Sequence, residues 1–188
     1  MWGPMVKMTG YKLYFADLKA GQVGFYGSLE EHGHPAILDL RLKIEDRKIS
    51  EMEAIVLRST ARGTFSDVQA LKVDPIMTQH LAPSEKRSRD ELITASDAYF
   101  EGMEKGADKV TPFDPDCKRI ENGVVTANDP GNAKQISRIN TPFDEPFSFQ
   151  ICELFKVRNG KLLRIEALVA PVPYGMPTGW GGNPSHKQ

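Results

Sequence analysis

The sequence predicts an α+β fold in which an antiparallel sheet is built from two related halves. Around the Asn-Gly pair at 159–160, β-branched and aromatic residues alternate with polar ones, which is typical of a tight hairpin. The stretch 42–56 (LKIEDRKISEMEAIV) aligns without a gap on 155–169 (FKVRNGKLLRIEALV), so that Glu53 matches Glu166. One amphipathic helix is expected between these two copies of the hairpin.

The first half is expected to form a three-stranded antiparallel meander. Residues 1–11 have no clear period, and the polar segment 17–22 is typical of a turn. A strand is expected at 23–29, followed by an alternating strand at 36–45 that has one polar face. Residues 49–58 then return antiparallel to it.

A linker and a helix follow the meander. Residues 59–87 contain prolines and mixed charges, which favours a linker with one helical turn near 76–80. Helix is predicted over 88–105, because Ser88 can cap its N-terminus with Glu91 as the capping-box partner, and Gly106 fits its end.

The second half contains the organising hairpin, which spans 147–175. A short strand is expected at 117–122, then a turn at Asn122-Gly123, a loop at 127–146 and the hairpin itself. The proline-rich tail after Pro171 is predicted to be an extended lid or contact arm, because proline suits neither a helix nor a central strand.

These boundaries divide the chain into a first copy (1–58), a linker (59–87) and a second copy with its helix and tail (88–188). The two copies can be separate units or one composite domain.

Composition excludes several classes of function. The chain has 24 Lys and Arg against 25 Asp and Glu, so a nucleic acid is not expected as a partner. Cys117 and Cys152 lack metal-ligand spacing and are interpreted as reduced structural thiols, with a disulfide framework or a zinc site as the alternatives. No apolar run is long enough for a membrane span, and the start of the sequence lacks a signal-peptide pattern, so we expect a cytoplasmic protein.

Longer motifs resemble a known family. The second half contains ELITASDAYFEGMEKG, VTPFDPDCKRIENGVV and ELFKVRNGKLLRIEALVAPVPYGMPTGW, and the first half contains GQVGFYGSLEEHG and LRLKIEDRKISEMEAIV. In these motifs the chain resembles a two-copy subgroup of the SnoaL-like branch of the NTF2-like superfamily. The resemblance implies a cone, in which a curved antiparallel sheet wraps around helices, with an apolar pocket and dimerisation through the sheet. The chain departs from the family in two respects: no helix precedes the strands of the first copy, and the loop at 127–146 is shorter than the resemblance implies.

The chain has no nucleotide-binding loop, metalloprotease motif or nucleophile elbow, which favours acid–base chemistry without a cofactor or metal. Arg119 and Glu121 lie two apart on one predicted strand, so they project to the same face and could hold and deprotonate a phenol or alcohol. The alternative is an ion pair on the solvent-facing side of the sheet.

Glu153 is the third candidate catalytic residue, because apolar residues flank it on its face of the strand. Tyr99, Phe155, Tyr174 and Trp180 are the candidate substrate-binding residues, with core packing as the alternative. Glu166 and its repeat mate Glu53 are interpreted as structural, each pairing with a lysine of the neighbouring strand.

The function expected from the resemblance is a cofactor-independent lyase acting on a small, apolar, lignin-derived aromatic molecule, such as the diarylpropane lyase activity that releases formaldehyde and leaves a stilbene. The alternatives are another isomerase or dehydratase, or a non-catalytic ligand-binding or assembly module. The expected partners are a small hydrophobic molecule and further copies of the chain in a homodimer or larger homo-oligomer, with no nucleic acid and no membrane.

Overall fold

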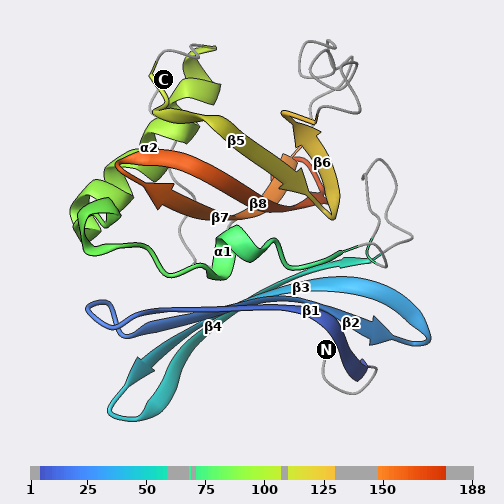
Figure 1. Cartoon of the computed structure of the whole chain (residues 1–188). Coiled ribbons are helices and arrows are strands. Elements are labelled where there is room, and N and C mark those ends of the chain that lie inside the picture. The colour runs from blue at the N-terminus through green and yellow to red at the C-terminus, as the bar shows by residue number, and fades with distance from the viewer. Residues whose placement is uncertain (1–4, 59–67, 69–70, 107–109, 130–147, 177–188) are drawn as a thin grey trace.

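The computed structural model describes residues 5–58, 68, 71–106, 110–129 and 148–176, and these form two four-stranded sheets. Figure 1 shows the first sheet, in blue and cyan, facing the second, in yellow to red, with the short helix α1 (Pro75–Thr78) between them. The predicted fold class is therefore wrong. The described residues are mostly β, with one long helix, and no sheet wraps around a set of helices.

Sheet A is an antiparallel meander of four strands in sequence order: β1 (Met5–Asp17), β2 (Gln22–Glu31), β3 (His34–Glu45) and β4 (Lys48–Arg58). The predicted strands β2 to β4 are confirmed. Strand β1 was not expected, because two register irregularities between Met5 and Lys12 break the alternation that marks a strand.

Sheet B has the strand order β6-β5-β8-β7, from β5 (Phe113–Glu121), β6 (Val124–Ala127), β7 (Ser148–Arg158) and β8 (Lys161–Val172). Strands β5 and β8 pair in parallel, and the other two pairs are antiparallel. The expectation of a purely antiparallel sheet is thus wrong. Most of the predicted loop 127–146 and the start of the organising hairpin at Phe147 lie outside the described residues.

The predicted helix is confirmed as α2 (Arg89–Lys105). Ser88 accepts a hydrogen bond from the backbone N–H of Glu91, whose carboxylate in turn accepts from the backbone N–H of Ser88. Gly106 ends the helix in the left-handed conformation. The linker contains α1 and a short 3-10 turn (Pro83–Glu85), near the predicted helical turn.

The sequence repeat is also a structural repeat. The hairpin β3–β4 turns at Asp46 and Arg47 and the hairpin β7–β8 at Asn159 and Gly160, all four with positive φ. Each hairpin has its register shift at the matching place, after Lys43 in the first copy and after Lys156 in the second. The two copies therefore share a backbone irregularity as well as a sequence pattern.

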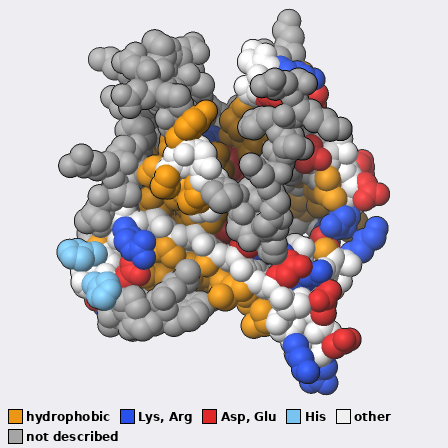
Figure 2. Space-filling view, turned by 180° about the vertical axis from the view of Figure 1, so that it is seen from behind, with side chains coloured by type: hydrophobic (Ala, Val, Ile, Leu, Met, Phe, Trp, Pro, Cys, Tyr) orange, Lys and Arg blue, Asp and Glu red, His pale blue; other side chains and the backbone are white. Residues whose placement is uncertain are grey.

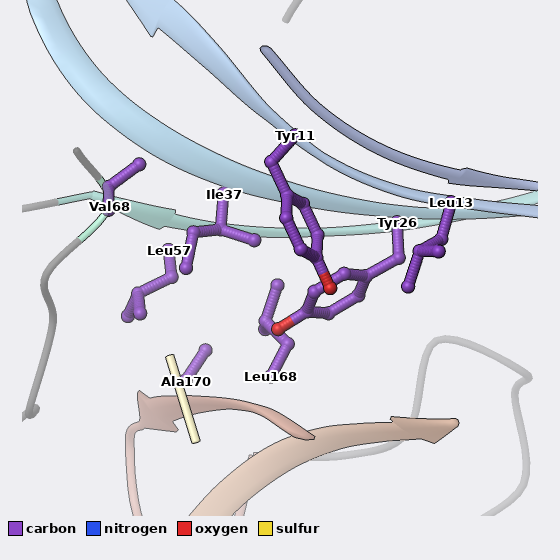
Figure 3. Packing of buried hydrophobic residues seen from close by; sticks show 8 residues of the cluster. All are labelled: Tyr11, Leu13, Tyr26, Ile37, Leu57, Val68, Leu168 and Ala170. Carbon is purple, nitrogen blue, oxygen red and sulfur yellow. The ribbon is translucent and has the colours of Figure 1, made fainter. Parts of the chain in front are cut away.

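The main core lies between the two sheets, as Figure 3 shows. It consists of Tyr11, Leu13, Tyr26, Ile37, Leu57, Val68, Leu168 and Ala170. Repeat-equivalent positions meet here, since Leu57 aligns with Ala170, and the partly buried Ile55 aligns with Leu168. Burial of these side chains supplies most of the favourable free energy that joins the halves.

Helix α2 covers the opposite face of sheet B. Ala95 and Tyr99 of the helix form a second cluster with Val157, Leu162 and Ile165. Within the described part of the chain, no helix is long and apolar enough to cross a membrane.

Candidate functional site

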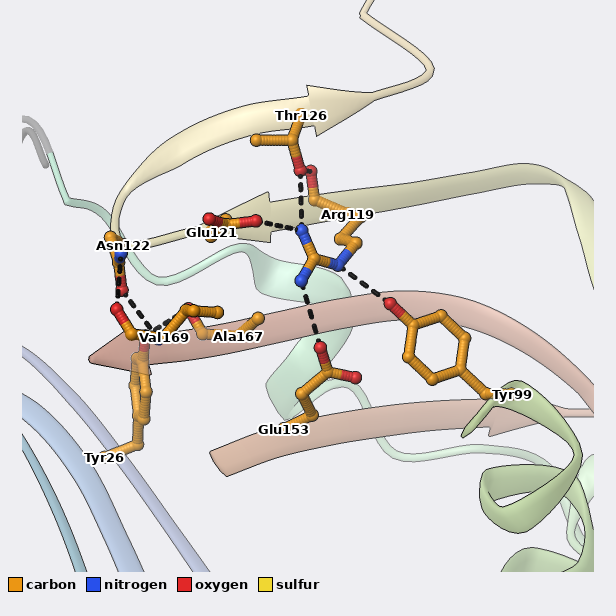
Figure 4. A network of polar contacts seen from close by, with 9 residues as sticks. All are labelled: Tyr26, Tyr99, Arg119, Glu121, Asn122, Thr126, Glu153, Ala167 and Val169. Atoms are coloured by element: carbon orange, nitrogen blue, oxygen red, sulfur yellow. Dashed lines mark hydrogen bonds and ion pairs between the residues drawn. The ribbon is translucent and has the colours of Figure 1, made fainter. Parts of the chain in front are cut away.

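A partly buried guanidinium group organises a polar network on the helix-covered face of sheet B (Figure 4). Arg119 of β5 forms an ion pair with Glu121 on its own strand and donates to the hydroxyl of Thr126 in β6 at 3.1 Å. Its Nη2 donates to Oε1 of Glu153 in β7 at 3.0 Å, and its Nε donates to the Tyr99 hydroxyl of α2 at 2.9 Å. Four elements thus converge on one side chain.

Strand pairing explains why these residues meet. Arg119 lies beside Ile165 of β8, and Glu121 lies beside Ala167. On the other side of β8, Phe155 also pairs with Ile165, and Glu153 with Ala167. Residues directly opposite one another share a face of the sheet. The two carboxylates therefore lie on the same face of sheet B, one on each side of β8.

The two carboxylates differ in exposure. The side chain of Glu153 is 1% exposed, whereas that of Glu121 is 22% exposed and that of Arg119 is 19% exposed. A molecule from solvent therefore meets Glu121 and Arg119 first. Oε2 of Glu153 has no hydrogen-bond partner among the described residues.

Burial changes the proton affinities in this network. Desolvation raises the pKa of Glu153, and the neighbouring guanidinium opposes that rise. Burial and the charge of Glu153 raise the pKa of Tyr99 to about 12. Burial disfavours the charge on Arg119, but Tyr99 and both carboxylates outweigh it, and the pKa of Arg119 is raised. Arg119 is thus a permanent cation between groups that compete for protons.

The Tyr99 hydroxyl already accepts from Arg119, so its own proton can turn toward Glu153. That hydroxyl lowers the pKa of Glu153, although Oε2 of Glu153 has no partner within hydrogen-bonding distance.

Aromatic side chains border the network on the helix side. The Tyr99 ring contacts Phe155 at a centroid distance of 5.2 Å, Phe100 at 5.3 Å and Phe113 at 6.2 Å, all edge to face. Phe100 and Phe113 are partly exposed. Charged groups and apolar rings are therefore adjacent on one face.

Of the seven predicted site residues, the structure brings five together: Arg119, Glu121, Glu153, Tyr99 and Phe155. Tyr174 is not with them in any described contact, and its side chain is 70% exposed in the segment after β8. Trp180 lies outside the described residues. The ion-pair alternative for Arg119 and Glu121 is correct about the pairing, but the pair is partly buried, and Tyr99 of α2 contacts Arg119 from the side away from Glu121.

Asn122 is a structural member of the site that sequence reasoning assigned only to a turn. It has positive φ, as the following glycine suggested, but its side chain is fully buried. Its Nδ2 donates to the Val169 carbonyl at 3.1 Å, and its Oδ1 accepts from the Val169 N–H at 3.0 Å. The side chain thus extends the β5–β8 pairing beyond Glu121. The RIENG motif was the available signal.

A second buried carboxylate lies on the other face of sheet B. Glu166 is fully buried toward sheet A, and burial raises its pKa to about 7. Neither of its oxygens, nor the nearby Tyr11 hydroxyl, has a hydrogen-bond partner among the described residues. Tyr11 still lowers this pKa, which indicates that its hydroxyl faces the carboxylate.

The repeat explains why no cation lies directly across the strand from Glu166 among the described residues. Its mate Glu53 pairs with Arg41 directly across the β3–β4 hairpin. The position equivalent to Arg41 is Leu154, and it is Leu154 that lies opposite Glu166. The predicted lysine partners are wrong for both copies. Lys43 pairs with Glu45 and Glu51, and Lys156 donates to the carbonyls of Met77 and Gln79.

A cavity of about 350 Å³ lies elsewhere, at the β1–β2 edge of sheet A. It is lined by Lys7, Thr9, Gly10, Tyr11, Ser28, Leu29, Glu30, Gly33, Pro35, Val68 and Leu71. None of these belongs to the Arg119 network. We place the candidate site at the network, because that is where ionisable groups from separate elements converge.

Within the described part of the chain, no three His, Cys, Asp or Glu side chains are grouped as a metal ion would require.

Comparison with known families gives one match. Residues 85–148 match the model of a family described as a domain of unknown function (DUF8021). The matched region is about a third of the chain and contains Tyr99, Arg119 and Glu121 but not Glu153. No curated protein and no solved structure matches the chain.

Proposed function

We propose that the Arg119 network is the acid–base site of a cofactor-independent lyase that acts on a small, largely apolar aromatic molecule. The observation that carries this proposal is the convergence of one guanidinium and two carboxylates of unequal exposure beside a cluster of aromatic rings. The likeness of the sequence motifs to SnoaL-like proteins supports the same class of chemistry.

The different exposures of the two carboxylates assign them different roles in the proposed reaction. Glu121 is the carboxylate that a substrate hydroxyl meets, and Arg119 is the cation that stabilises the developing oxyanion. Glu153 holds Arg119 from behind, and burial raises the pKa of its carboxyl group. Glu153 is also a candidate for direct proton transfer.

A diarylpropane with a terminal CH2OH and a neighbouring benzylic hydroxyl illustrates the reaction. Glu121 accepts the terminal O–H proton, and the electrons of that bond form the C=O of formaldehyde. The C–C bond breaks, and its electrons form the C=C bond of the stilbene. The benzylic hydroxide leaves, takes up the proton and becomes water, so no redox partner is required.

Tyr99 and Phe155 would form the apolar wall against which the substrate ring lies. Tyr174 and Trp180 stay proposals as substrate contacts. A Tyr174→Ala variant with an unchanged Michaelis constant would remove Tyr174 from the site.

The test is turnover of a panel of lignin-derived diaryl substrates by the purified protein without added cofactor. Turnover is measured as the release of formaldehyde. Glu121→Gln and Glu153→Gln should each lower kcat at least about tenfold, a loss typical for a displaced acid–base group. Glu104→Gln, at an exposed position of α2, is the matched control. Full turnover in both site variants would refute these assignments.

A non-catalytic ligand-binding module is the second candidate. It is favoured by the number of protein partners around Arg119. A guanidinium whose donors are already bonded to the protein is better suited to shaping a binding site than to stabilising a reacting group. In that case Glu121→Gln would keep ligand affinity, and no member of the substrate panel would be converted by the wild type.

We also propose that the protein self-associates through the outer face of sheet A. Tyr14, Val23 and Met52 are exposed there and adjoin the partly buried Phe25 and Leu40 in neighbouring strands. Exposed apolar patches of this kind often mark contacts between proteins. Sedimentation at micromolar concentration should give a dimer, and a Met52→Glu variant should give a monomer. A monomeric wild type would refute the proposal.

A further inference from the structure

We infer that the flat face of the Arg119 guanidinium is a stacking platform for an electron-rich aromatic ring of the ligand. This inference rests on the proposed site, since it names the class of molecule that the site takes, and its test does not require turnover.

The edge of the guanidinium is occupied by protein. Arginine has five N–H donors in one plane. Tyr99 takes the Nε–H, Glu121 and Thr126 take the Nη1 hydrogens, and Glu153 takes one of the Nη2 hydrogens. Figure 4 shows these four partners distributed around the group. A ligand carboxylate therefore cannot bind Arg119 through the usual two parallel hydrogen bonds.

Among the described residues, these four partners leave the second Nη2 hydrogen and the flat faces of the guanidinium for a ligand. Arg119 lies beside Ile165 of β8, and its side chain contacts Glu153 of β7 and Tyr99 of α2. The side chain is still 19% exposed although its edge is engaged. Partners in the plane also hold the group rigid, which reduces the entropy lost when a ring stacks on it.

The charges around Arg119 also favour a neutral, electron-rich ring over an anionic ligand. Glu121 and Glu153 together carry two negative charges against the single positive charge of Arg119. A neutral ring with an electron-rich face is attracted to the guanidinium without adding a negative charge to this cluster. An aromatic carboxylate adds such a charge, and an electron-poor ring lacks the attraction.

The experiment measures binding of three neutral ligands of similar shape to the intact protein: 4-methylanisole, 4-nitrotoluene and 1-methoxy-4-methylcyclohexane. The affinity for 4-methylanisole should exceed that for each of the others by roughly 3- to 10-fold, as expected for a partly desolvated cation–π contact. Benzoate should bind more weakly than all three. Equal affinities for the three neutral ligands would overturn the inference.

Arg119→Lys is the matched variant, because it keeps the charge but removes the planar group. It should bind 4-methylanisole and the cyclohexane analogue equally. Since this variant also loses buried hydrogen bonds, the Nε–H resonance of wild-type Arg119 provides an independent measurement. An upfield shift on adding 4-methylanisole, and not on adding the cyclohexane analogue, is expected from ring stacking, and its absence would contradict the platform.

The outcomes separate this inference from the proposed function. Ring-dependent affinity without turnover of the diaryl panel would leave the platform intact and refute the lyase. Turnover without ring-dependent affinity would support the lyase and refute the stacking platform.

Discussion

The hydroxyl of Tyr26 in sheet A donates a hydrogen bond of 3.1 Å to the carbonyl oxygen of Ala167 in sheet B. The same carbonyl accepts the backbone N–H of Asn122 at 2.9 Å, so one oxygen joins the inter-sheet core to the strand end that follows Glu121. Both Tyr26 and Ala167 are fully buried. This contact ties the position of the candidate site to the packing of the other half of the chain.

Replacing Tyr26 with phenylalanine should lower the free energy of unfolding by about 1 kcal/mol, because a buried hydrogen bond is lost while Ala167 keeps its second donor. Urea unfolding measures the change. Tyr14→Phe is the control, since Tyr14 is 73% exposed and should show no measurable change. Equal effects of the two substitutions would show that the inter-sheet bond contributes nothing.

Asn122→Ala should lower the free energy of unfolding by roughly 2–4 kcal/mol. It leaves the N–H and carbonyl of Val169 unpaired in the interior, and it places alanine at φ 51°. Asn159→Ala is a matched control, because Asn159 has φ 54° before a glycine but is exposed. The difference between the two variants in chemical unfolding isolates the buried hydrogen bonds. A control that destabilises as much as Asn122→Ala would contradict this role.

Glu166 should make the protein less stable as pH rises from about 4.5 to 7. Its folded pKa of about 7 lies above the reference value of 4.5, so the native state binds more protons than the unfolded state in this window. Stability is therefore lost as the buried carboxyl ionises, by roughly 3 kcal/mol in total if the full shift is expressed.

Glu166→Gln should remove most of that dependence and raise the melting temperature at pH 8. Glu53→Gln, at the repeat-equivalent position, should not stabilise, because Glu53 is paired with Arg41. Thermal unfolding between pH 5 and 8 compares the two. A Glu166→Gln protein with an unchanged pH profile would show that folding does not raise the pKa of Glu166.

Removing the helix cap provides a test of a local feature. Ser88→Ala should destabilise the protein by about 1 kcal/mol, because the N–H of Glu91 loses its side-chain acceptor. Ser96→Ala is the control, since the Ser96 hydroxyl donates to a carbonyl within the exposed helix surface. An equal loss in both variants, measured by urea unfolding, would contradict a capping role for Ser88.

Features with local causes could be predicted from the sequence. The boundaries of α2 follow from Ser88, Glu91 and Gly106, which act within one turn of the helix ends. The turn of the β7–β8 hairpin follows from Asn159-Gly160, which adopts the positive φ values that this dipeptide favours.

The pairing of distant strands could not be predicted in the same way. Strands β5 and β8 lie side by side in parallel, yet some forty residues of sequence separate them, and no turn chemistry reports such a pairing. The architecture inferred from the family resemblance failed at this level, because strand order depends on contacts between segments that carry no common local signal.

The candidate site shows both situations. Alternation along one strand correctly put Arg119 and Glu121 on a common face. Glu153 and Tyr99 were chosen for their surroundings and residue type, but their contact with Arg119 depends on the order of β5, β8 and β7 and on the placement of α2. Asn122 was recognised as a turn residue, and its buried hydrogen bonds to Val169 depend on the same parallel pairing.

Repeat-equivalent residues meet in the core. The two hairpins therefore pack against each other as two subunits of a homodimer would, but within a single chain. Leu57 and Ala170 occupy matching positions on the two hairpins and belong to one cluster, as do Ile55 and Leu168. Asp39 and Cys152 also match, and each shifts the pKa of the other across the sheets. A fragment ending near residue 62 and a fragment beginning near residue 70 should therefore recognise each other in trans. The two hairpins differ in their cross-strand contacts, since Leu154 lies opposite Glu166 where Arg41 lies opposite Glu53.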